Sequence, residues 1–301
     1  MTDITKEQAG RHLGKAVTYA DQYDSNLLVP VERVHNRIGY GIDENDLPFI
    51  GYDTWNAYEV SFLLSNGFPV SCVAKINYPC TSHSIIESKS IKLYLNSFNM
   101  TKFEGSKWEA VKTVEGIIAS DLTAVLGAKV DVALHFDATN AHLWSKYEHA
   151  PFHNLEELID AEDVEFTHFN EDPEILQLET NEDYSKVLRV HSNLLRSNCR
   201  ITNQPDWGDV YIHIEGEKIP TAESLTQYIV SMRKESHFHE EICECIYKRL
   251  WDKFQPEKLM VTCIYTRRGG IDICPARASH EELLSDSLRD VTRHVEKTLR
   301  Q

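Results

Sequence analysis

The chain has 301 residues, with 31 Lys or Arg against 47 Asp or Glu, so its formal net charge is −16 at pH 7 and its pI is about 5.3. A nucleic-acid-binding surface needs clustered cations that displace counterions, so this charge argues against a polyanion as the main ligand and against direct nucleic-acid binding. Hydrophobic residues make up 42% of the chain and charged residues 26%, which is typical of globular proteins and excludes a disordered chain.

The N-terminal segment predicts no export and no membrane anchor. Residues 1–10 are polar and lack the apolar core of a signal peptide, and no apolar run approaches the roughly 18 residues that span a bilayer. We therefore expect a cytoplasmic protein with no membrane partner. Seven cysteines are an odd number in a long chain without an export signal, so reduced thiols are expected rather than disulfides.

An acidic segment divides the chain. Residues 154–184 hold 12 acidic residues and no Lys or Arg, which leaves the rest of the chain with a net charge of −4. Such a one-signed stretch repels itself and packs poorly, so we interpret it as a solvated connector, with short helical or extended pieces. An acidic docking site for a partner is the alternative. The expected units are an N-terminal module over 1–150, a connector over 151–185 and a C-terminal module over 186–301.

The N-terminal half carries a hairpin followed by a helix and a strand. Apolar and polar residues alternate over 58–64 and over 70–76, with Ser-Asn-Gly between them as a hairpin turn. Apolar residues then recur at three- and four-residue spacing over 108–125, and Gly127 stands where a helix C-cap belongs. Residues 130–136 alternate again and predict a further strand.

The C-terminal half repeats this order. Residues 186–195 are extended and apolar-rich, 209–214 form a short strand, and 238–254 carry one helical apolar stripe. Residues 259–265 alternate before the Arg-Arg-Gly-Gly of 267–270. Two copies of strand, strand, helix and strand predict a tandem α+β protein whose antiparallel sheets are covered by helices on one face.

No common nucleotide-binding fingerprint is present. Gly39 and Gly41 are followed by Glu44 where a third glycine of the dinucleotide motif would stand, and the sequence has no P-loop. Any nucleotide that binds is therefore held without a Rossmann fold.

A cysteine and a carboxylate stand in a turn-rich stretch over 196–209. The abundance of turn formers predicts that Cys199 lies at a strand end or on a loop, where reactive side chains are commonly presented. A thiolate there is a strong nucleophile, and Asp206, seven positions on, offers a carboxyl group for proton transfer. The alternative is a small buried Cys199 with Asp206 capping a turn.

A second cluster has the sequence ESKSIKLY over 87–94. The Glu87 carboxylate could accept paired N–H donors from a purine-like ring, and Ser with Lys could hold a phosphate. The alternative is a helix start at which Ser88 is the cap and the lysines lie in water.

Two further clusters are weaker. On a helix, His239 and Cys243 share a face, but Cys245 points elsewhere and the second His of a zinc motif is missing, so a polar first helical turn is favoured over a metal site. The Arg-Arg-Gly-Gly of 267–270 offers two cations beside backbone that can approach a phosphate closely. Its alternative is an ordinary hairpin turn.

Together and in this order, these clusters resemble the NADPH-dependent 7-cyano-7-deazaguanine reductases, the nitrile reductases of queuosine biosynthesis in tRNA modification. The resemblance covers nearly the whole chain and rests on residues 87–98, 197–199 with 204–206, 238–240 and 267–270. It is closest to the long, two-module type of that family. It implies tandem tunnelling-fold (T-fold) modules, each an antiparallel sheet with two helices on one face, joined edge to edge into a barrel, and a homodimer.

The resemblance also implies the reaction. Two NADPH would reduce the nitrile of 7-cyano-7-deazaguanine (preQ0) to the primary amine of 7-aminomethyl-7-deazaguanine (preQ1). Cys199 would add to the nitrile as a thiolate and form a thioimide, while Asp206 would protonate the nitrile nitrogen. A first hydride would give a thiohemiaminal, its collapse an imine kept from water, and a second hydride the amine.

The family's binding residues match positions of this chain. By resemblance, the deazaguanine would be held by Ile86, Glu87, Ser88, His239 and Glu240, and NADPH would be contacted by Ser88, Lys89, Arg268 and Gly269, with no metal. The side-chain chemistry agrees, since carboxylate acceptors would face a donor-rich ring edge while cations and a glycine would face phosphates.

Two other functions remain as alternatives. One is a zinc-dependent hydrolase or cyclohydrolase of the same broad fold that acts on a pterin or GTP, which would need a His and Cys ligand set. The other is a noncatalytic nucleobase-binding module that uses the acidic segment for docking. It would bind a ligand without turnover.

Overall fold

The computed structural model describes residues 20, 22–136, 152–159, 164–181, 186–201 and 204–292. Its N-terminal half contains β1 (Pro30–Glu32), α2 (Val34–Arg37), β2 (Ile50–Leu64), β3 (Pro69–Pro79), β4 (Ser84–Ile86), α3 (Ser88–Ser97), β5 (Lys102–Phe103), α4 (Lys107–Leu126) and β6 (Asp131–His135), with short 3-10 turns at Ser25–Leu27, Ile38–Tyr40 and Phe98–Met100.

The described C-terminal half begins within the acidic segment. Its elements are β7 (His153–Asn154), β8 (Val187–Ser192), β9 (Arg196–Cys199), β10 (Pro205–Glu215), α5 (Ala222–Ser231), β11 (Ser236–His237), α6 (His239–Phe254), β12 (Lys258–Tyr265), β13 (Ile271–Ala278) and α7 (Asp286–Arg289), with 3-10 turns at Leu155–Leu158, Pro173–Ile175, Met232–Lys234 and Glu281–Leu283.

The elements predicted in the N-terminal half are confirmed. The hairpin is β2 and β3, which are longer than expected and change register at a bulge between Ala57 and Val60. Helix α4 begins at a reciprocal capping box between Ser106 and Glu109 and ends at Gly127, whose φ of 64° is left-handed. The strand expected over 130–136 is β6.

The predicted strands and helix of the C-terminal half are also present as β8, β10, α6 and β12. Two of the larger elements of this half, α5 and β13, were not predicted. Helix α5 begins where the Thr221 side chain accepts from the Ser224 amide. Strand β13 contains Pro275, a residue that argues against a strand interior because it cannot donate to the ladder.

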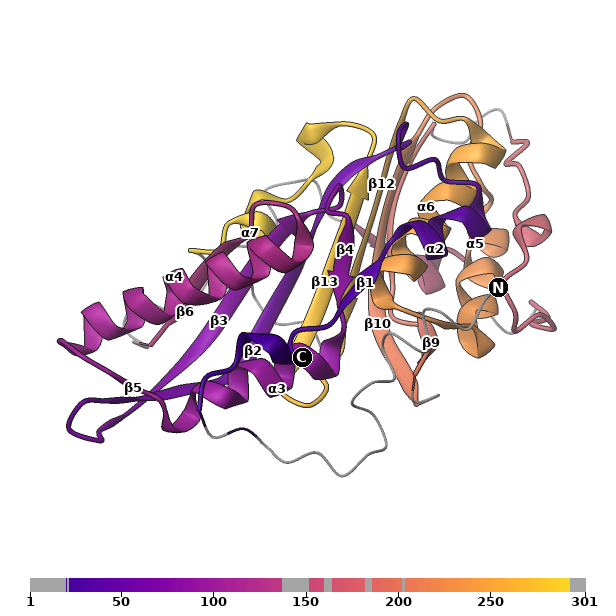
Figure 1. Cartoon of the computed structure of the whole chain (residues 1–301). Helices are drawn as coiled ribbons and strands as arrows, with labels where there is room; N and C mark the ends of the chain where they lie inside the picture. The colour runs from indigo at the N-terminus through magenta and orange to yellow at the C-terminus, as the bar shows by residue number, and fades with distance from the viewer. Residues whose placement is uncertain are drawn as a thin grey trace.

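One sheet runs through the described part of the chain. Eleven strands form it: eight lie along the path β11-β9-β10-β12-β13-β2-β3-β6, β8 pairs with β10, β7 pairs with β8, and β5 pairs with β2. The halves meet at the seam, the antiparallel pairing of β13 with β2, which runs from Ile271 opposite Ala57 to Ala278 opposite Ile50. The seam therefore joins the sheets of the two halves edge to edge (Figure 1).

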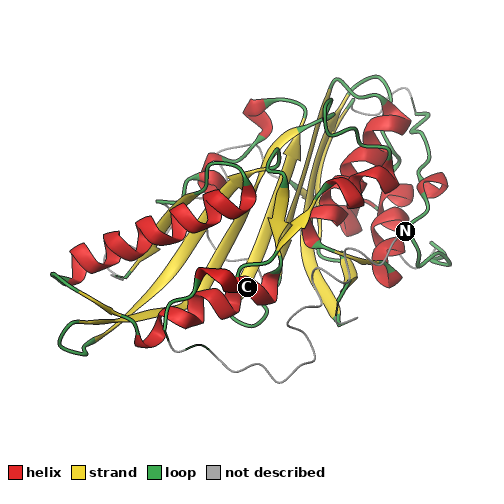
Figure 2. Cartoon of the chain, viewed as in Figure 1, coloured by secondary structure: helices red, strands yellow, loops and turns green. Residues whose placement is uncertain are grey.

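The long helices cover one face of this sheet. Helices α3 and α4 pack on β2, β3 and β6, and helices α5 and α6 pack on β8, β10 and β12 (Figure 2). The short α7 lies on the opposite face, where Leu284 and Leu288 pack against Tyr52. The α+β class, with antiparallel sheets and helices on one face, is confirmed.

The acidic segment packs more closely than its charge led us to expect. Leu155 and Leu176 are fully buried in the C-terminal core. Glu171 accepts hydrogen bonds from Arg249 and Tyr228, so positive and polar partners from α6 and α5 offset its charge. The expected unit boundaries, at 150/151 and 185/186, lie at least partly outside the described residues, as does the N-terminal segment 1–10.

Beneath the seam lies a buried network of five charged side chains. Arg277 on β13 donates to Asp53 on β2 (2.8 Å) and to Glu244 on α6 (2.9 Å). Arg33 also binds Asp53, and Arg37 binds Glu244 through two hydrogen bonds (2.7 and 2.9 Å). All five side chains are at most 5% exposed. The network therefore ties β1–α2, the seam and α6 into one unit.

Arginine charge keeps the buried carboxylates of this network ionised. Burial alone would raise the pKa of Glu244, but Arg277 and Arg37 outweigh it and lower that pKa to about 2. Burial also opposes ionisation of Asp53, whose pKa is nevertheless held below its usual value by Arg277 and Arg33. Since both pKa values are depressed, this stabilisation is present above about pH 4 and is lost as the pH falls further.

Among the described residues, no helix combines the length and the apolar character that crossing a bilayer requires.

Arg277→Met should lower the free energy of unfolding by about 3–5 kcal/mol, because it leaves Asp53 and Glu244 buried with fewer counter-charges. Urea unfolding measures the change. The control is Lys112→Met, which breaks the half-exposed surface pair with Glu115 and should cost less than about 1 kcal/mol. Equal small effects of both substitutions would contradict a structural role for the network.

Candidate active site

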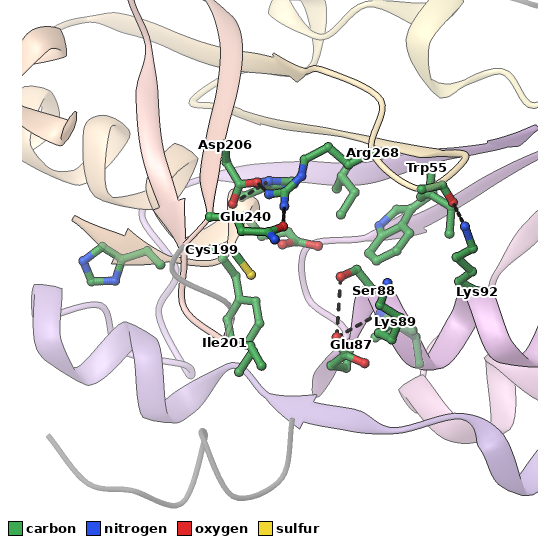
Figure 3. A pocket seen from close by; sticks show the side chains of 18 residues that line it. Trp55, Glu87, Ser88, Lys89, Lys92, Cys199, Ile201, Asp206, Glu240 and Arg268 are labelled. Carbon is green, nitrogen blue, oxygen red and sulfur yellow. Dashed lines mark hydrogen bonds and ion pairs between the residues drawn. The ribbon is translucent and has the colours of Figure 1, made fainter. Parts of the chain in front are cut away.

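A cavity of about 370 Å³ lies beside the seam and receives residues from both halves (Figure 3). All ten predicted site residues line it: Ile86, Glu87, Ser88, Lys89, Cys199, Asp206, His239, Glu240, Arg268 and Gly269. The other lining residues were not predicted as site residues: Trp55, Lys92, Ile201, Gln204, His237, Phe238, Ile271 and Ile273. Lys92, Gln204 and Phe238 belong to the motifs already noted, whereas Trp55 and the isoleucines carry no signal beyond strand alternation.

The β9–β10 hairpin brings Cys199 and Asp206 to one face of the sheet. Asp206 is the cross-strand partner of Ser197, and Cys199 lies two residues from Ser197 along the same strand. Cross-strand partners share a face, as do residues two apart in a strand, so the thiol and the carboxyl group face the same side. The Cys199 amide also donates to the Gln204 carbonyl (2.8 Å), which closes the hairpin.

Cys199 is the last residue of β9, as the sequence predicts. It is half-buried, whereas the other six cysteines, all within the described residues, are buried. The alternative interpretation, in which Cys199 is simply a small buried residue, does not fit this exposure. Figure 3 shows its sulfur directed into the cavity, across from Ser88 and Trp55.

Asp206 is buried (3% exposed) and paired with two donors. Its carboxylate binds the Arg268 guanidinium and lies 3.4 Å from Nε2 of His239. Burial would raise the pKa of Asp206, but His239 and Arg268 outweigh it and lower that pKa below its usual value. Asp206 is therefore ionised at neutral pH, in a state ready to accept a proton.

The N-terminus of α6 supplies His239 and Glu240. The His239 ring stacks on Tyr265, with ring centroids 3.9 Å apart and an angle of 13° between the planes. Nδ1 of His239 and Oε1 of Glu240 are buried and have no hydrogen-bond partner among the described residues. Buried polar atoms are normally paired, so these two atoms are suited to a ligand.

The pKa of the Glu240 carboxyl group lies close to neutral pH. The side chain is 3% exposed, and burial, with a further contribution from the Asp53 carboxylate, raises the pKa of Glu240 to about 7. His239 and Arg33 oppose this rise. The carboxyl group is thus half protonated at neutral pH, and N–H donors of a ligand would favour its ionised form.

Glu87 begins helix α3. Its carboxylate accepts from the amides of Lys89 (2.9 Å) and Ser90 (2.7 Å), so Glu87 and not Ser88 is the cap. Glutamate is an uncommon N-cap, which is why the sequence favours serine there. A carboxylate has about four lone-pair directions, so the two amides fix its orientation and leave acceptor capacity for a ligand.

Cations and glycine form one edge of the cavity. Lys89, Lys92 and Arg268 line it together with Gly269. Lys92 donates to the Gly269 carbonyl (2.7 Å), and both Gly269 and Gly270 have left-handed φ values of 57° and 80°. The Arg-Arg-Gly-Gly segment is thus a tight hairpin turn between β12 and β13 that also presents a cation, and this edge is suited to phosphate groups.

A charged cluster supports β11, the short strand that leads into Phe238 and His239 at the start of α6. His237, the ladder partner of Cys199, lies 2.9 Å from Glu235 and 2.8 Å from Glu241. Burial would lower the pKa of His237, but these carboxylates raise it to about 9, so the imidazole is a cation at neutral pH. Arg200 also binds Glu241 (2.9 Å), which fixes the turn after Cys199 against α6.

The described residues provide no ligand set for the alternative function, a zinc-dependent hydrolase. Within the part of the chain that the structure describes, no group of three His, Cys, Asp or Glu side chains is arranged to hold a metal ion. The Cys243 thiol is fully buried and donates to the Val261 carbonyl on β12, away from His239.

Comparison with known proteins places this chain in a family. A family profile described as "Nitrile reductase, 7-cyano-7-deazaguanine-reductase N-term" matches residues 19–134, and one described as "QueF-like protein" matches residues 205–283. A relative from Polaromonas sp. named NADPH-dependent 7-cyano-7-deazaguanine reductase is 42% identical over 92% of this chain and 96% of its own. The chain belongs to this family.

Other members are similarly related. Reductases of the same name from Colwellia psychrerythraea and Acidovorax ebreus are 38% and 41% identical, over 90% and 92% of this chain and 92% and 96% of their own. A crystal structure of an archaeosine synthase, QueF-Like, in the apo form aligns with 33% of this chain and 98% of its own at 17% identity and a TM-score of 0.30.

An alkylating reagent should modify the native protein once, at Cys199, because the other six thiols are buried. Peptide mass spectrometry after a short exposure to iodoacetamide identifies the site, and the same treatment in denaturant should label all seven cysteines. Equal labelling of Cys199 and Cys72 in the native protein would contradict the described exposure.

Proposed function

We propose that this protein is an NADPH-dependent oxidoreductase that reduces the nitrile of 7-cyano-7-deazaguanine to the amine of 7-aminomethyl-7-deazaguanine, in queuosine biosynthesis. Membership in the reductase family supports the reaction. The observation that carries the proposal for the site is one cavity, lined from both halves, in which a half-exposed Cys199 shares a face with an ionised Asp206.

The nucleobase would be recognised by two carboxylates. Glu87 and Glu240 line the cavity from α3 and α6, and both can accept from the ring and amino N–H groups of the deazaguanine. Ile86, Ser88 and His239 complete the substrate contacts. The unpartnered Oε1 of Glu240 supports this assignment, since a ligand donor would satisfy it.

Cys199 and Asp206 would carry out the covalent step. The Asp206 carboxylate takes the proton of the Cys199 thiol as the sulfur adds to the nitrile carbon, and the same proton passes to the nitrile nitrogen, which gives a neutral thioimide. The lowered pKa of Asp206 suits this order, because a resting carboxylate must accept a proton before it can donate one. His239, 3.4 Å from Asp206, orients that carboxylate.

NADPH would be held at the cationic edge by Ser88, Lys89, Arg268 and Gly269. Each NADPH would supply one hydride when bound, so the four-electron reduction requires two NADPH molecules in turn. The fit rests on the positive side chains of Lys89 and Arg268 and on the close backbone approach that Gly269 permits. Arg268 here binds Asp206 and Gln204, so it links the cofactor edge to the proton-transfer carboxylate.

Several expectations that accompany this function stay predictions. They are a homodimer, a cytoplasmic location, no direct contact with nucleic acid, the closure of T-fold modules into a barrel, and the division into modules at 1–150 and 186–301 with a connector at 151–185.

The proposal is tested by NADPH oxidation on addition of 7-cyano-7-deazaguanine, with the product identified by mass spectrometry. Two NADPH consumed per nitrile, with the aminomethyl product, is the expected result. Binding of the nitrile without oxidation by folded protein would instead favour the noncatalytic module. Hydrolysis of GTP or a pterin that depends on bound zinc would favour the hydrolase.

Asp206→Asn should lower the turnover number at least 100-fold and change the dissociation constant of the nitrile less than about threefold, since its task is proton transfer. The control is Gln204→Ala, which removes the other Arg268 partner but no titratable group and should keep turnover within about fivefold. Steady-state kinetics and calorimetry measure both. Turnover by Asp206→Asn at the wild-type rate would rule out the assigned role.

Nucleobase binding should weaken as the pH falls through 7. Because the pKa of Glu240 is raised to about 7, protonation removes an acceptor, and the dissociation constant should rise about tenfold per pH unit below pH 6 and be flat above pH 8. Calorimetry in a Cys199→Ala background, which prevents covalent chemistry, measures it. Glu240→Gln should bind more weakly at high pH and show no such slope, and a slope that persisted would assign the titration to another group.

A further inference from the structure

Arg200, the residue after Cys199, has a side chain that none of the proposed substrate, cofactor or proton-transfer contacts uses. The side chain is 12% exposed and follows the end of β9. One terminal nitrogen of its guanidinium binds the Glu241 carboxylate (2.9 Å), and the other donates to the amide oxygen of Asn36. Its Nε donates to the Ser236 carbonyl (3.4 Å). The guanidinium therefore joins the turn after the nucleophile to α6, α2 and β11.

Backbone pairing alone gives the Cys199 end of β9 little support. The strand has four residues, and it pairs with β10 over three residue pairs and with β11 over two. A chain segment with so few backbone hydrogen bonds opens easily unless side chains fix it. Arg200 supplies such an anchor directly beside the thiol, and because its ion pair is largely buried, solvent and salt screen it little.

The partner of Arg200 lies beside the other half of the reaction. Glu241 directly follows Glu240, the proposed acceptor for the nucleobase, in the first turn of α6. Its carboxylate is 2% exposed and also binds the His237 cation (2.8 Å), so its position is fixed. The pair of Arg200 with Glu241 therefore links the residues that come directly after the nucleophile and the acceptor.

Nitrile addition depends on the spacing between Cys199 and Glu240. The nitrile carbon lies at a fixed distance from the ring that Glu240 would hold, so the sulfur reaches that carbon only if the spacing is kept. Reacting atoms must approach to about 3–3.5 Å, and a misplacement of about 1 Å can cost about 100-fold in rate. Since the two residues lie on different elements, β9 and α6, a link between these elements is needed.

On the basis of the proposed function, we propose that Arg200 is a positioning residue for nitrile addition: its guanidinium, bridging α6 and α2, holds the Cys199 sulfur at the distance from the bound nucleobase that the addition requires. The bond to Asn36 connects the nucleophile to α2, which the buried network ties to α6 through Arg37. Positioning of this kind leaves the intrinsic reactivity of the thiol and the affinity for the nitrile unchanged, so it differs from activation by charge.

Arg200→Met should slow the covalent addition of 7-cyano-7-deazaguanine to Cys199 about 100-fold, because the apolar stem stays and the link is lost. Intact mass against time, at saturating nitrile and without NADPH, measures this rate. Alkylation of Cys199 by iodoacetamide should stay within about threefold of the wild-type rate, since a small reagent needs no set distance. The dissociation constant of the nitrile in a Cys199→Ala background should also stay within about threefold.

Arg196→Met is the matched control. Arg196 lies on the same strand and donates to the Arg233 carbonyl, but it forms no ion pair within the described residues, so nitrile addition should stay within about threefold of wild type. Addition by Arg200→Met as fast as by this control would overturn the proposal. So would an equal fall in the alkylation rate, which would assign Arg200 to the reactivity of the thiol, or an equal loss of nitrile affinity, which would assign it to nucleobase binding.

A double-mutant cycle tests the ion pair itself. In Glu241→Gln protein the link is already broken, so adding Arg200→Met should slow nitrile addition by less than about fivefold, against about 100-fold in the wild-type background. The same factor in both backgrounds would show that Arg200 acts independently of Glu241 and would contradict the bridge to α6.

Arg200→Lys covers the case in which Arg200→Met does not fold. An ammonium group keeps the charge opposite Glu241 but lacks the planar fork that reaches Asn36 at the same time, so addition should be about tenfold slower than in wild type with alkylation unchanged. A wild type that forms no adduct and oxidises no NADPH would end the proposed function. An active wild type matched by Arg200→Lys in its rate of addition would sink this inference alone.

Discussion

The buried network of Arg33, Arg37, Arg277, Asp53 and Glu244 is the constraint on which the rest of the structure depends. Burying so many charges is costly unless each is paired, and here every carboxylate oxygen of Asp53 and Glu244 meets at least one guanidinium. The partners come from the β1–α2 segment, from both strands of the seam and from α6. A change in the angle between the two halves would separate them, so the network fixes how the halves meet and hence the shape of the cavity between them.

The same network explains why two glutamates one helical turn apart behave differently. Glu244 meets three guanidinium groups and its pKa falls to about 2, whereas Glu240 meets none directly, lies near the Asp53 carboxylate, and has its pKa raised to about 7. The Glu244 carboxylate is therefore paired within the fold, whereas the Glu240 carboxylate, one turn earlier in α6, can accept hydrogen bonds from a ligand. This contrast lets a rigid scaffold keep one acceptor unsatisfied in the site.

The sequence predicts local structure well and long-range structure poorly. Alternation and capping signals identify the β2–β3 hairpin, α4 and α6, and the motif residues converge on one cavity because each motif follows or begins an element that ends there. Nothing local marks β13, whose Pro275 argues against a strand, or the pairing of Arg277 with Asp53, which lie 224 positions apart. From the sequence, Trp55 is likewise predicted only as an ordinary strand residue. The structure shows that the pairing of β13 with β2 brings it beside the site.

The measurement that tests the account most directly is the intact mass of the protein after incubation with 7-cyano-7-deazaguanine in the absence of NADPH. The account predicts a gain equal to one nitrile molecule per chain, located at Cys199 by peptide analysis, discharged when NADPH is added, and missing in Cys199→Ala. Turnover of the nitrile by a protein that never carries the adduct, or by Cys199→Ala, would contradict it.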